Sequence, residues 1–317
     1  MKRTILSLLA LALALCGCGN DFNTPSKLDR PRVLAIQAEP PQPAFGATTT
    51  LRPLVYLPEG ESASYAWSWC PLPTSSAEAF TCHTDQTGAD ALFAELGVPG
   101  APPLALGAGD TVAFTNPFAP ATLATLCSSG NGAADPLLFA CTGAGLPVTI
   151  SLVVHASEGD FSAITYLYLP VDDTLPPNQN PTISGLTVGE PGQVLDGSGS
   201  LALPRDSHVP IHVVMDEAAA EQLPHPGPDG KPDERLTLSW YAEGGDFGYQ
   251  GHGGARTGYL GDPTDPLSTF GMALGNTWNT PTTADYPGRD SRIIVVVRDS
   301  RGGVSWVSGL STLESTP

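Results

Sequence analysis

The chain of 317 residues is short of charge, and short above all of positive charge. Charged residues make up 15% of it, against about 25% in a typical soluble domain. Lysine and arginine number 14 against 32 aspartates and glutamates, which gives a formal net charge of −18. Such an acidic surface repels phosphate backbones and anionic lipid headgroups. The composition therefore argues against nucleic-acid partners and against electrostatic docking on a membrane.

The sequence also lacks the common catalytic and metal-binding motifs. It contains no GxSxG, no HExxH and no Walker loop, and the glycines of Asp196–Ser200 are wrongly placed for a nucleophile elbow. His208 and His212 are four residues apart, but the intervening Val209-Pro210-Ile211 favours extended chain. Four residues of strand span about 13 Å, too far for one ion. We therefore predict a non-catalytic protein; an enzyme whose site is assembled from scattered residues is the alternative.

Glycine and proline, by contrast, are abundant, with 35 and 32 residues, about a fifth of the chain against about 12% in ordinary usage. Both residues interrupt helices, so the composition favours many short strands joined by turns. The apolar fraction of 41% is enough to fill real cores. The length suggests about two domains, at roughly 100–200 residues each.

The N-terminus has the pattern of an export signal. Lys2 and Arg3 precede an apolar stretch, Ile5–Leu15, that is too short to span a bilayer as a helix. It ends in Leu15-Cys16-Gly17-Cys18, which resembles the bacterial lipobox, with Leu at −3 and a small residue at −1 from the modified cysteine. The resemblance implies that residues 1–17 are a signal peptide and that Cys18 is lipidated. Ordinary cleavage after Ala14 is the alternative.

The same resemblance implies a location. In Gram-negative lipoproteins an Asp after the modified cysteine is associated with retention in the inner membrane, so Gly19 at that position implies the outer membrane, facing either the periplasm or the cell surface. Residues 18–30 are polar, and we expect a short flexible tether. Without Lys2 and Arg3 the chain has 12 basic and 32 acidic residues, a net charge of −20, so the lipid must hold it on the membrane.

Four further cysteines are Cys70, Cys82, Cys127 and Cys141. An even number in an exported chain points to disulfides, and three pairings are open. We expect Cys70–Cys82 and Cys127–Cys141, because each pair closes a short loop, worth about 3 kcal/mol for about 15 residues in the chain-entropy model. A metal site is the alternative, against which the lack of any CxxC pair argues.

Three features recur in the same order in the two halves of the chain, which predicts two copies of one β-sandwich plan. They are an opening strand that leads to Glu-Pro, a strand that carries tryptophan, and a closing hairpin around a glycine turn. In the first half these are Arg32–Pro40, Tyr65–Trp69, and Val148–His155 with Ala163–Leu169. In the second half they are Thr182–Pro191, Leu236–Tyr241, and Arg292–Arg298 with Val304–Leu310. We expect the tryptophans to fill the sandwich cores, with a carbohydrate-stacking platform as the alternative.

This pattern resembles bacterial Ig-like and PKD-like modules, in particular predicted Gram-negative lipoproteins built from them. The residues that carry the resemblance are Glu39-Pro40-Pro41, Trp69-Cys70-Pro71 and the closing hairpins. It implies an all-β fold of two tandem Ig-like β-sandwich domains, the first with a disulfide-stapled insertion of loops and short helices. The chain departs from the pattern because it lacks a disulfide between the two sheets and a WDFGDG turn, of which Tyr241–Phe247 is a loose echo.

The domain boundaries follow from a segment rich in Pro and Asn at residues 172–181, which we expect to be a linker. The first domain then covers residues 31–171, the second covers 182–312, and 313–317 form a tail. Inside the first domain, residues 71–109 are an insertion with helical spacing at Asp90–Leu96. A second short helix is expected at Pro120–Leu126.

A long glycine-rich loop, Gly244–Tyr259, is the first candidate for a contact surface. Its candidate contact residues are Phe247, Tyr249, Gln250, His252, Arg256 and Tyr259. Loops on rigid sandwiches often carry recognition, and Tyr with Gly is a typical contact composition. A long hairpin tip without a partner has the same composition, so both interpretations stay open.

An acidic turn is the candidate cation site. Asp229, Asp233 and Glu234 cluster there, and Asp216, Glu217 and Glu221 are near in sequence. Calcium takes six to eight oxygens from such flexible loops. An EF-hand spacing is missing and Lys231 lies in the middle, so a solvated acidic loop is the other interpretation.

Together these observations predict a non-catalytic, lipid-anchored cell-envelope protein that presents Ig-like surfaces to a protein or polysaccharide partner. No cofactor is expected, and calcium at the acidic turn is the alternative. The alternatives are a calcium-assisted carbohydrate-binding module and an enzyme with a hidden site.

Overall fold

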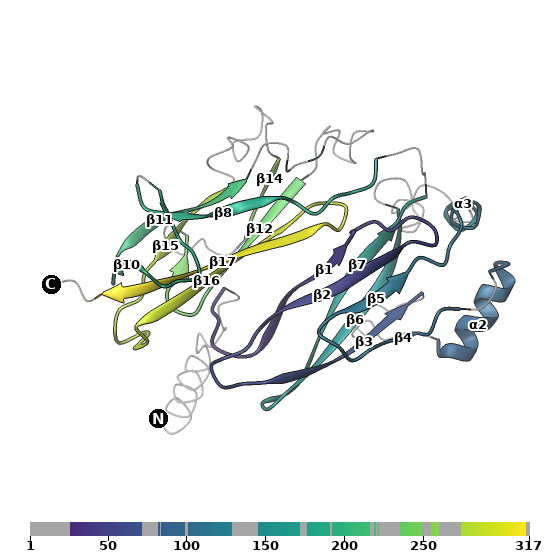
Figure 1. Ribbon diagram of the computed structural model, residues 1–317, viewed down its shortest axis with the longest axis horizontal. Coiled ribbons are helices and arrows are strands. Elements are labelled where there is room, and N and C mark those ends of the chain that lie inside the picture. Colours follow the sequence, from purple (N-terminus) through teal and green to yellow (C-terminus); the bar gives the residue numbers. More distant parts are fainter. Residues whose placement is uncertain are drawn as a thin grey trace, which may run out of the picture.

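A computed structural model describes residues 26–71, 82, 84–98, 101–128, 145–171, 176–190, 192–215, 219, 221, 235–248, 255–259 (main chain) and 274–314. These residues form two β-sandwiches that lie against each other (Figure 1). The predicted signal peptide and Cys18 lie outside the described residues.

In the first sandwich, a three-stranded sheet packs against a four-stranded sheet, and all neighbouring strands are antiparallel. The first sheet has the order β1-β2-β5, with β1 at Arg32–Glu39, β2 at Thr48–Tyr56 and β5 at Val112–Thr115. The second has the order β4-β3-β6-β7, with β4 at Ala105–Gly107, β3 at Ala63–Cys70, β6 at Leu146–Ala156 and β7 at Gly159–Leu169.

In the second sandwich, two five-stranded sheets pack against each other. One has the order β10-β17-β16-β12-β14, with β10 at Leu201–Pro204, β17 at Val304–Glu314, β16 at Asp290–Arg298, β12 at Arg235–Ala242 and β14 at Ala255–Tyr259. The other has the order β13-β15-β11-β8-β9, with β13 at Asp246–Phe247, β15 at Gly275–Asn279, β11 at His208–Met215, β8 at Ile183–Val188 and β9 at Gln193–Val194. β10 runs parallel to β17, and the other pairs are antiparallel. β17 continues to Glu314, into the segment expected as a tail, because Leu313 is buried in the core.

The strand order makes both sandwiches Ig-like. In that fold, strands A, B and E form one sheet and strands C, F and G form the other. The first sandwich places β1, β2 and β5 opposite β3, β6 and β7, and the second places β8, β11 and β15 opposite β12, β16 and β17. The predicted all-β, tandem Ig-like fold is therefore confirmed.

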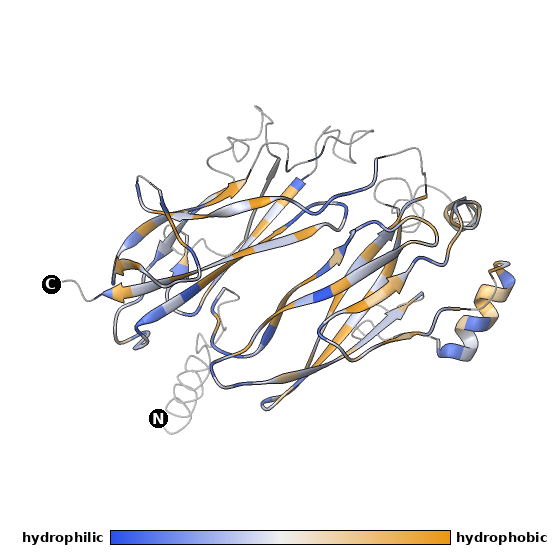
Figure 2. Ribbon diagram, in the orientation of Figure 1, coloured by the Kyte–Doolittle hydropathy of each residue, from blue (hydrophilic) through white to orange (hydrophobic). Residues whose placement is uncertain are grey.

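Tryptophan fills the centre of each core, as the sequence pattern predicts (Figure 2 shows the apolar residues along the strands). Trp67 and Trp69 of β3 are 2% and 1% exposed, and Trp240 of β12 is 1% exposed. These strands are in the C position, where Ig domains keep a buried tryptophan. Trp69 meets the rings of Phe93 and Phe114 edge-on, with centroids 5.9 and 5.3 Å apart. Rings buried in this way serve the core and are closed to a carbohydrate.

Both predicted helices are present in the first sandwich, one inside the insertion and one after it. α2 covers Gln86–Glu95, and Asp85 caps its N-terminus by accepting the N–H of Gly88 at 2.9 Å. α2 joins the core through Phe93, which is fully buried. α3 covers Pro120–Ser128. The helix bounds differ by a few residues from those expected, which is usual for helix ends.

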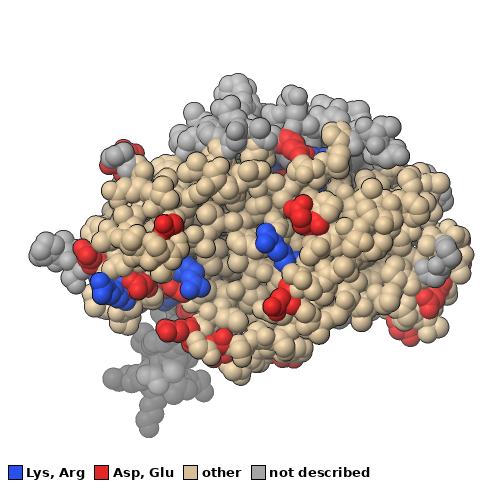
Figure 3. Space-filling view, viewed as in Figure 1, with Lys and Arg blue, Asp and Glu red and all other residues tan. Residues whose placement is uncertain are grey.

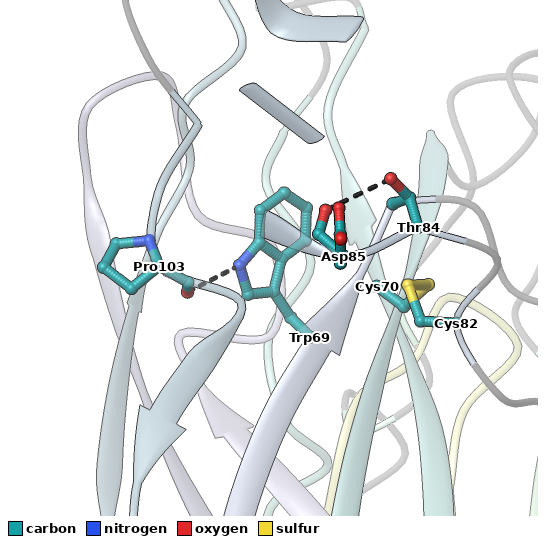
Figure 4. Close-up of a disulfide and its surroundings, with 6 residues drawn as sticks. All are labelled: Trp69, Cys70, Cys82, Thr84, Asp85 and Pro103. Atoms are coloured by element: carbon teal, nitrogen blue, oxygen red, sulfur yellow. Dashed lines mark hydrogen bonds between the residues drawn. A yellow bond between two sulfur atoms is a disulfide. The ribbon is translucent and has the colours of Figure 1, made fainter. Parts of the chain in front are cut away.

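The Cys70–Cys82 disulfide joins the end of β3 to the chain that leads into α2, with Cα atoms 5.6 Å apart (Figure 4). Beside it, the indole N–H of Trp69 donates to the carbonyl of Pro103 at 3.0 Å. Cys127 is buried and is also disulfide-bonded, but Cys141, its predicted partner, lies outside the described residues. The disulfide at Cys70 thus staples the insertion where it leaves the sheet, as predicted.

Candidate functional site at the joint between the sandwiches

A third apolar cluster packs the two sandwiches together, and we call it the joint. It combines residues before and within β1, the end of β2, and β16 and β17; its buried members are Leu28, Leu34, Ala35, Tyr56, Ile294, Val296 and Val304. β16 is buried on both faces: Val295 enters the core of the second sandwich, and Val296 enters the joint. Each fully buried aliphatic side chain contributes about 1.5–3 kcal/mol, so the cluster couples the sandwiches strongly.

Polar side chains cross the joint as well. The guanidinium of Arg298 in β16 donates to the carbonyl of Leu34 in β1, and the side-chain amide of Gln37 donates to the carbonyl of Val304 in β17. Arg52 in β2 donates to the side-chain oxygen of Gln37 and lies 4.7 Å from the ring centre of Trp306. These contacts fix how β1 and β2 sit on β16 and β17.

The end of the expected tether is part of the joint. Ser26–Leu28 runs beside the end of β12, where the carbonyl of Ala242 accepts the N–H of Leu28 at 2.8 Å and the N–H of Ala242 donates to Ser26 at 2.9 Å. Leu28 is 2% exposed. Residues 18–30 were expected to be flexible throughout; the last part is instead docked, because Leu28 finds an apolar site and its main chain finds partners.

The last residues of the expected linker are docked in the same way. Asn178 is fully buried, and its N–H donates to the side-chain oxygen of Gln42 at 3.0 Å. The amide of Asn180 donates to the carbonyl of Ala38 and accepts the N–H of Val304, both at 2.8 Å. Asn180 therefore bridges β1 of one sandwich and β17 of the other.

Asp299, in the turn between β16 and β17, is a partly buried carboxylate beside the joint. It accepts the N–H groups of Arg301 and Gly303 at 2.8 Å and the side-chain N–H of Asn178 at 3.2 Å. Burial nonetheless raises the pKa of Asp299 above its ordinary value. The side-chain oxygen of Asn178 is buried and has no hydrogen-bond partner among the residues described.

Glu221 pairs with Arg301 at the other side of the same turn. Burial raises the pKa of Glu221, and the guanidinium of Arg301 offsets this in part. The sequence placed Glu221 near the candidate calcium residues, but here its carboxylate is held by an arginine. An ion pair at this position serves the joint rather than a cation.

A groove of about 470 Å³ opens beside the joint. Its walls are Val33–Ile36 of β1, Ala163–Tyr166 and Tyr168 of β7, and Arg298–Ser300 and Gly302–Val304 around the turn between β16 and β17, with Tyr241 contributing from β12. Tyr166 is 39% exposed, and burial raises the pKa of Tyr168, with smaller effects of Tyr166 and Asp299. Tyrosine offers an apolar ring and a polar tip, so this groove can bind both apolar and hydrogen-bonding groups.

The predicted contact loop Gly244–Tyr259 is placed only in part. Phe247 is 2% exposed and packs on Trp240 with ring centroids 5.8 Å apart, so it belongs to the core and is removed from the contact surface. Arg256 and Tyr259 lie on β14, opposite Leu238 and Arg235 of β12. Tyr249, Gln250 and His252 lie outside the described residues.

The candidate calcium residues Asp229, Asp233 and Glu234 also lie outside the described residues. Within the described part of the chain, no group of three or more His, Cys, Asp or Glu side chains is arranged to hold a metal ion. His208 and His212 lie on β11 in extended chain, as expected, and His208 is 2.6 Å from the side-chain oxygen of Asn279. No helix among the described residues is long and apolar enough to cross a membrane.

The sequence held a signal for the joint that its alternation did not reveal. Leu34–Ala38 and Ile293–Val297 are continuous runs of buried residues. A strand with one solvent-exposed face instead alternates buried and exposed residues. Such runs indicate burial on both faces, and hence a second layer outside the sandwich. Their partners could not be inferred, because the contacts join residues more than 250 positions apart.

No protein-family model and no curated protein matches the chain. Similar solved structures include the three N-terminal domains of the bacteriophage RB49 highly immunogenic outer capsid protein, with 9% identity over 90% of this chain and 71% of that one and a TM-score of 0.21. Another is murine CEACAM1b, with 10% identity over 90% of this chain and 100% of that one and a TM-score of 0.23. A third is the N-terminal Ig1-2 module of the Drosophila receptor protein tyrosine phosphatase DLAR, with 9% identity over 91% of this chain and 100% of that one and a TM-score of 0.23. Scores this low do not bear on function, and the Ig-like assignment comes from the strand order of this chain.

Proposed function

We propose that the chain is a lipid-anchored cell-envelope protein that binds a partner through its two Ig-like domains and performs no catalysis. The observation that carries the proposal is the tyrosine-lined groove beside a joint that holds the two sandwiches as one unit. Many protein-binding surfaces consist of tyrosine, glycine and serine side chains that a rigid scaffold holds in place. Charged side chains are scattered over the face shown in Figure 3.

The anchor is the first part to test. Cys18→Ser in the full chain is expected to lose metabolic labelling by a fatty acid, whereas Cys16→Ser keeps it. Protease treatment of intact cells then reports which side of the outer membrane the sandwiches occupy. Retained label in Cys18→Ser would exclude lipidation at this residue.

The binding role is tested by photo-crosslinking in living cells. A photoreactive residue at Tyr166 is expected to capture one discrete envelope protein, and one at Phe45, which is 57% exposed away from the groove, serves as the control. Equal capture at both positions would count against a specific site. Covalent labelling of the purified chain by hydrolase probes at a Ser or Cys would overturn the non-catalytic part.

A carbohydrate ligand is the second candidate, because the three tyrosines of the groove could stack on sugar rings. A calcium requirement would then implicate the acidic residues Asp229, Asp233 and Glu234. Glycan arrays probed with and without calcium separate this alternative from a protein partner.

A further inference from the structure

The strand β7 is unpaired on its outer edge, and the turn that contains Gly302 lies against only its last part, at Tyr166 and Tyr168. Its residues pair on one side with β6, from Gly159 opposite Ala156 to Leu169 opposite Leu146. On the other side, no main-chain or side-chain hydrogen bond to β7 is present in the described part of the chain. Exposed edges are usually protected by proline, lysine or a bulge. β7 has none of these, and Asp160 is its one charged residue.

The corresponding strand of the second sandwich, β17, is covered at both of its ends. The N–H of Val304 is taken by Asn180, and the N–H of Leu310 by the carbonyl of Asp196. Beyond these, β10 pairs in parallel with Ser311–Glu314. The chain therefore covers both ends of this edge in the second sandwich, whereas the groove lies beside the unpaired edge in the first.

We infer, on the basis of the proposed binding function, that an extended segment of a partner protein adds as a strand to the outer edge of β7. Its main chain would pair along Gly159–Ile164, and an apolar side chain near its end would enter the groove between Tyr166 and Tyr241. This is recognition by strand addition, in which main-chain hydrogen bonds give affinity and a side-chain pocket gives specificity. The site is continuous with the joint, because the turn that contains Gly302 closes one end of the groove against Tyr166 and Tyr168.

The charges around the open end define the segment further. Glu158 is exposed in the turn between β6 and β7, and Asp160 is exposed at the start of β7, 2.8 Å from the ring nitrogen of His155. Glu61 lies beside this turn, where it accepts the hydroxyl of Ser157. A segment that follows β7 passes this acidic end. Lysine or arginine at that end, alternating apolar residues and no proline are therefore the expected features of the partner segment.

A displayed library of random ten-residue peptides, selected on the full mature chain, tests the site without requiring the natural partner. Selected peptides are expected to share these features and to protect the amide hydrogens of Gly159–Ile164 from exchange. Methylation of alternate peptide nitrogens is expected to weaken binding at least tenfold when it falls on the edge that faces β7, and little on the other edge. Insensitivity to methylation on both edges would exclude strand addition.

Two variants locate the site. Tyr166→Ala is expected to weaken binding of the selected peptides by roughly tenfold, as for a contact residue at the centre of an interface. Phe45→Ala is the matched control, since it removes an exposed aromatic ring outside the groove and should leave binding unchanged. Equal binding by both variants, or a library that yields no peptide at β7, overturns the inference. The proposed function would survive that result if the photoreactive residue at Tyr166 still captures a partner.

Discussion

Trp69 and Trp240 occupy corresponding places in the two sandwiches, but their indole N–H groups differ. Trp69 donates to Pro103, whereas the Trp240 nitrogen is buried without a partner among the described residues. Phenylalanine removes a similar volume at each site, but at residue 69 it also breaks a hydrogen bond. We expect Trp69→Phe to lower the free energy of unfolding by about 1 kcal/mol more than Trp240→Phe. Urea denaturation measures both; a reversed order would contradict the assignment.

Asp299 gives the joint a pH dependence. Its pKa is raised on folding, so the folded chain binds the proton more tightly than the unfolded chain. Its contribution to stability is then fully present below the ordinary Asp pKa, near 4, and is lost as pH rises through the raised pKa. Asp299→Asn should reduce this dependence and leave the chain at least as stable at pH 7, because it removes a charge that burial disfavours and its oxygen can still accept the N–H groups of Arg301 and Gly303.

Thermal unfolding of the wild type and of Asp299→Asn between pH 4 and pH 7 measures this difference. Glu221 has a raised pKa as well and supplies a residual dependence of the same sign in both proteins. A variant that is clearly less stable than the wild type at pH 7 would show that the carboxylate is needed in its charged form.

At the scale of elements, the closing hairpins use glycine for different reasons. Gly159 and Gly302 have φ of 121° and 97°, where other residues are strained. A Cβ on Gly159 would meet no atom within 4 Å, whereas on Gly302 it would lie 2.9 Å from the Tyr168 ring. Gly159→Ala should therefore cost about 1–2 kcal/mol of backbone strain, and Gly302→Ala should cost more. Denaturation curves of the two variants compare the costs, and equal values would show that the Tyr168 contact yields freely.

The hairpins and the tryptophan strands could be predicted because their signals are local. Alternation around a glycine turn predicts β6 with β7, and the paired features predict two sandwiches. Phe247 was misplaced because glycine-rich loops and short core strands share a composition; β13 turns its ring onto Trp240. The groove could not be predicted, because β1, β7 and the turn at Asp299 meet only through the joint.

At the scale of the molecule, both chain segments outside the sandwiches end at the joint. Leu28 arrives from the N-terminal side and Asn178 from the linker, and both are buried. Seven residues separate Cys18 from Ser26, a span of at most about 28 Å. If Cys18 carries lipid, the joint and its groove are therefore held close to the membrane, and a partner at β7 would be another envelope protein or a segment that reaches this surface.

Adjacent valines on β16 separate the stability of the second sandwich from that of the joint. Val295 and Val296 are both fully buried, the first in the sandwich core and the second in the joint. A buried unpaired charge is strongly destabilising wherever it cannot reach water. Val295→Asp should unfold the second sandwich, whereas Val296→Asp should part the two sandwiches and leave each folded. Small-angle scattering and circular dichroism distinguish these outcomes: Val296→Asp should increase the radius of gyration without loss of strand signal. An unchanged radius of gyration would mean that the joint does not set the arrangement of the sandwiches in solution.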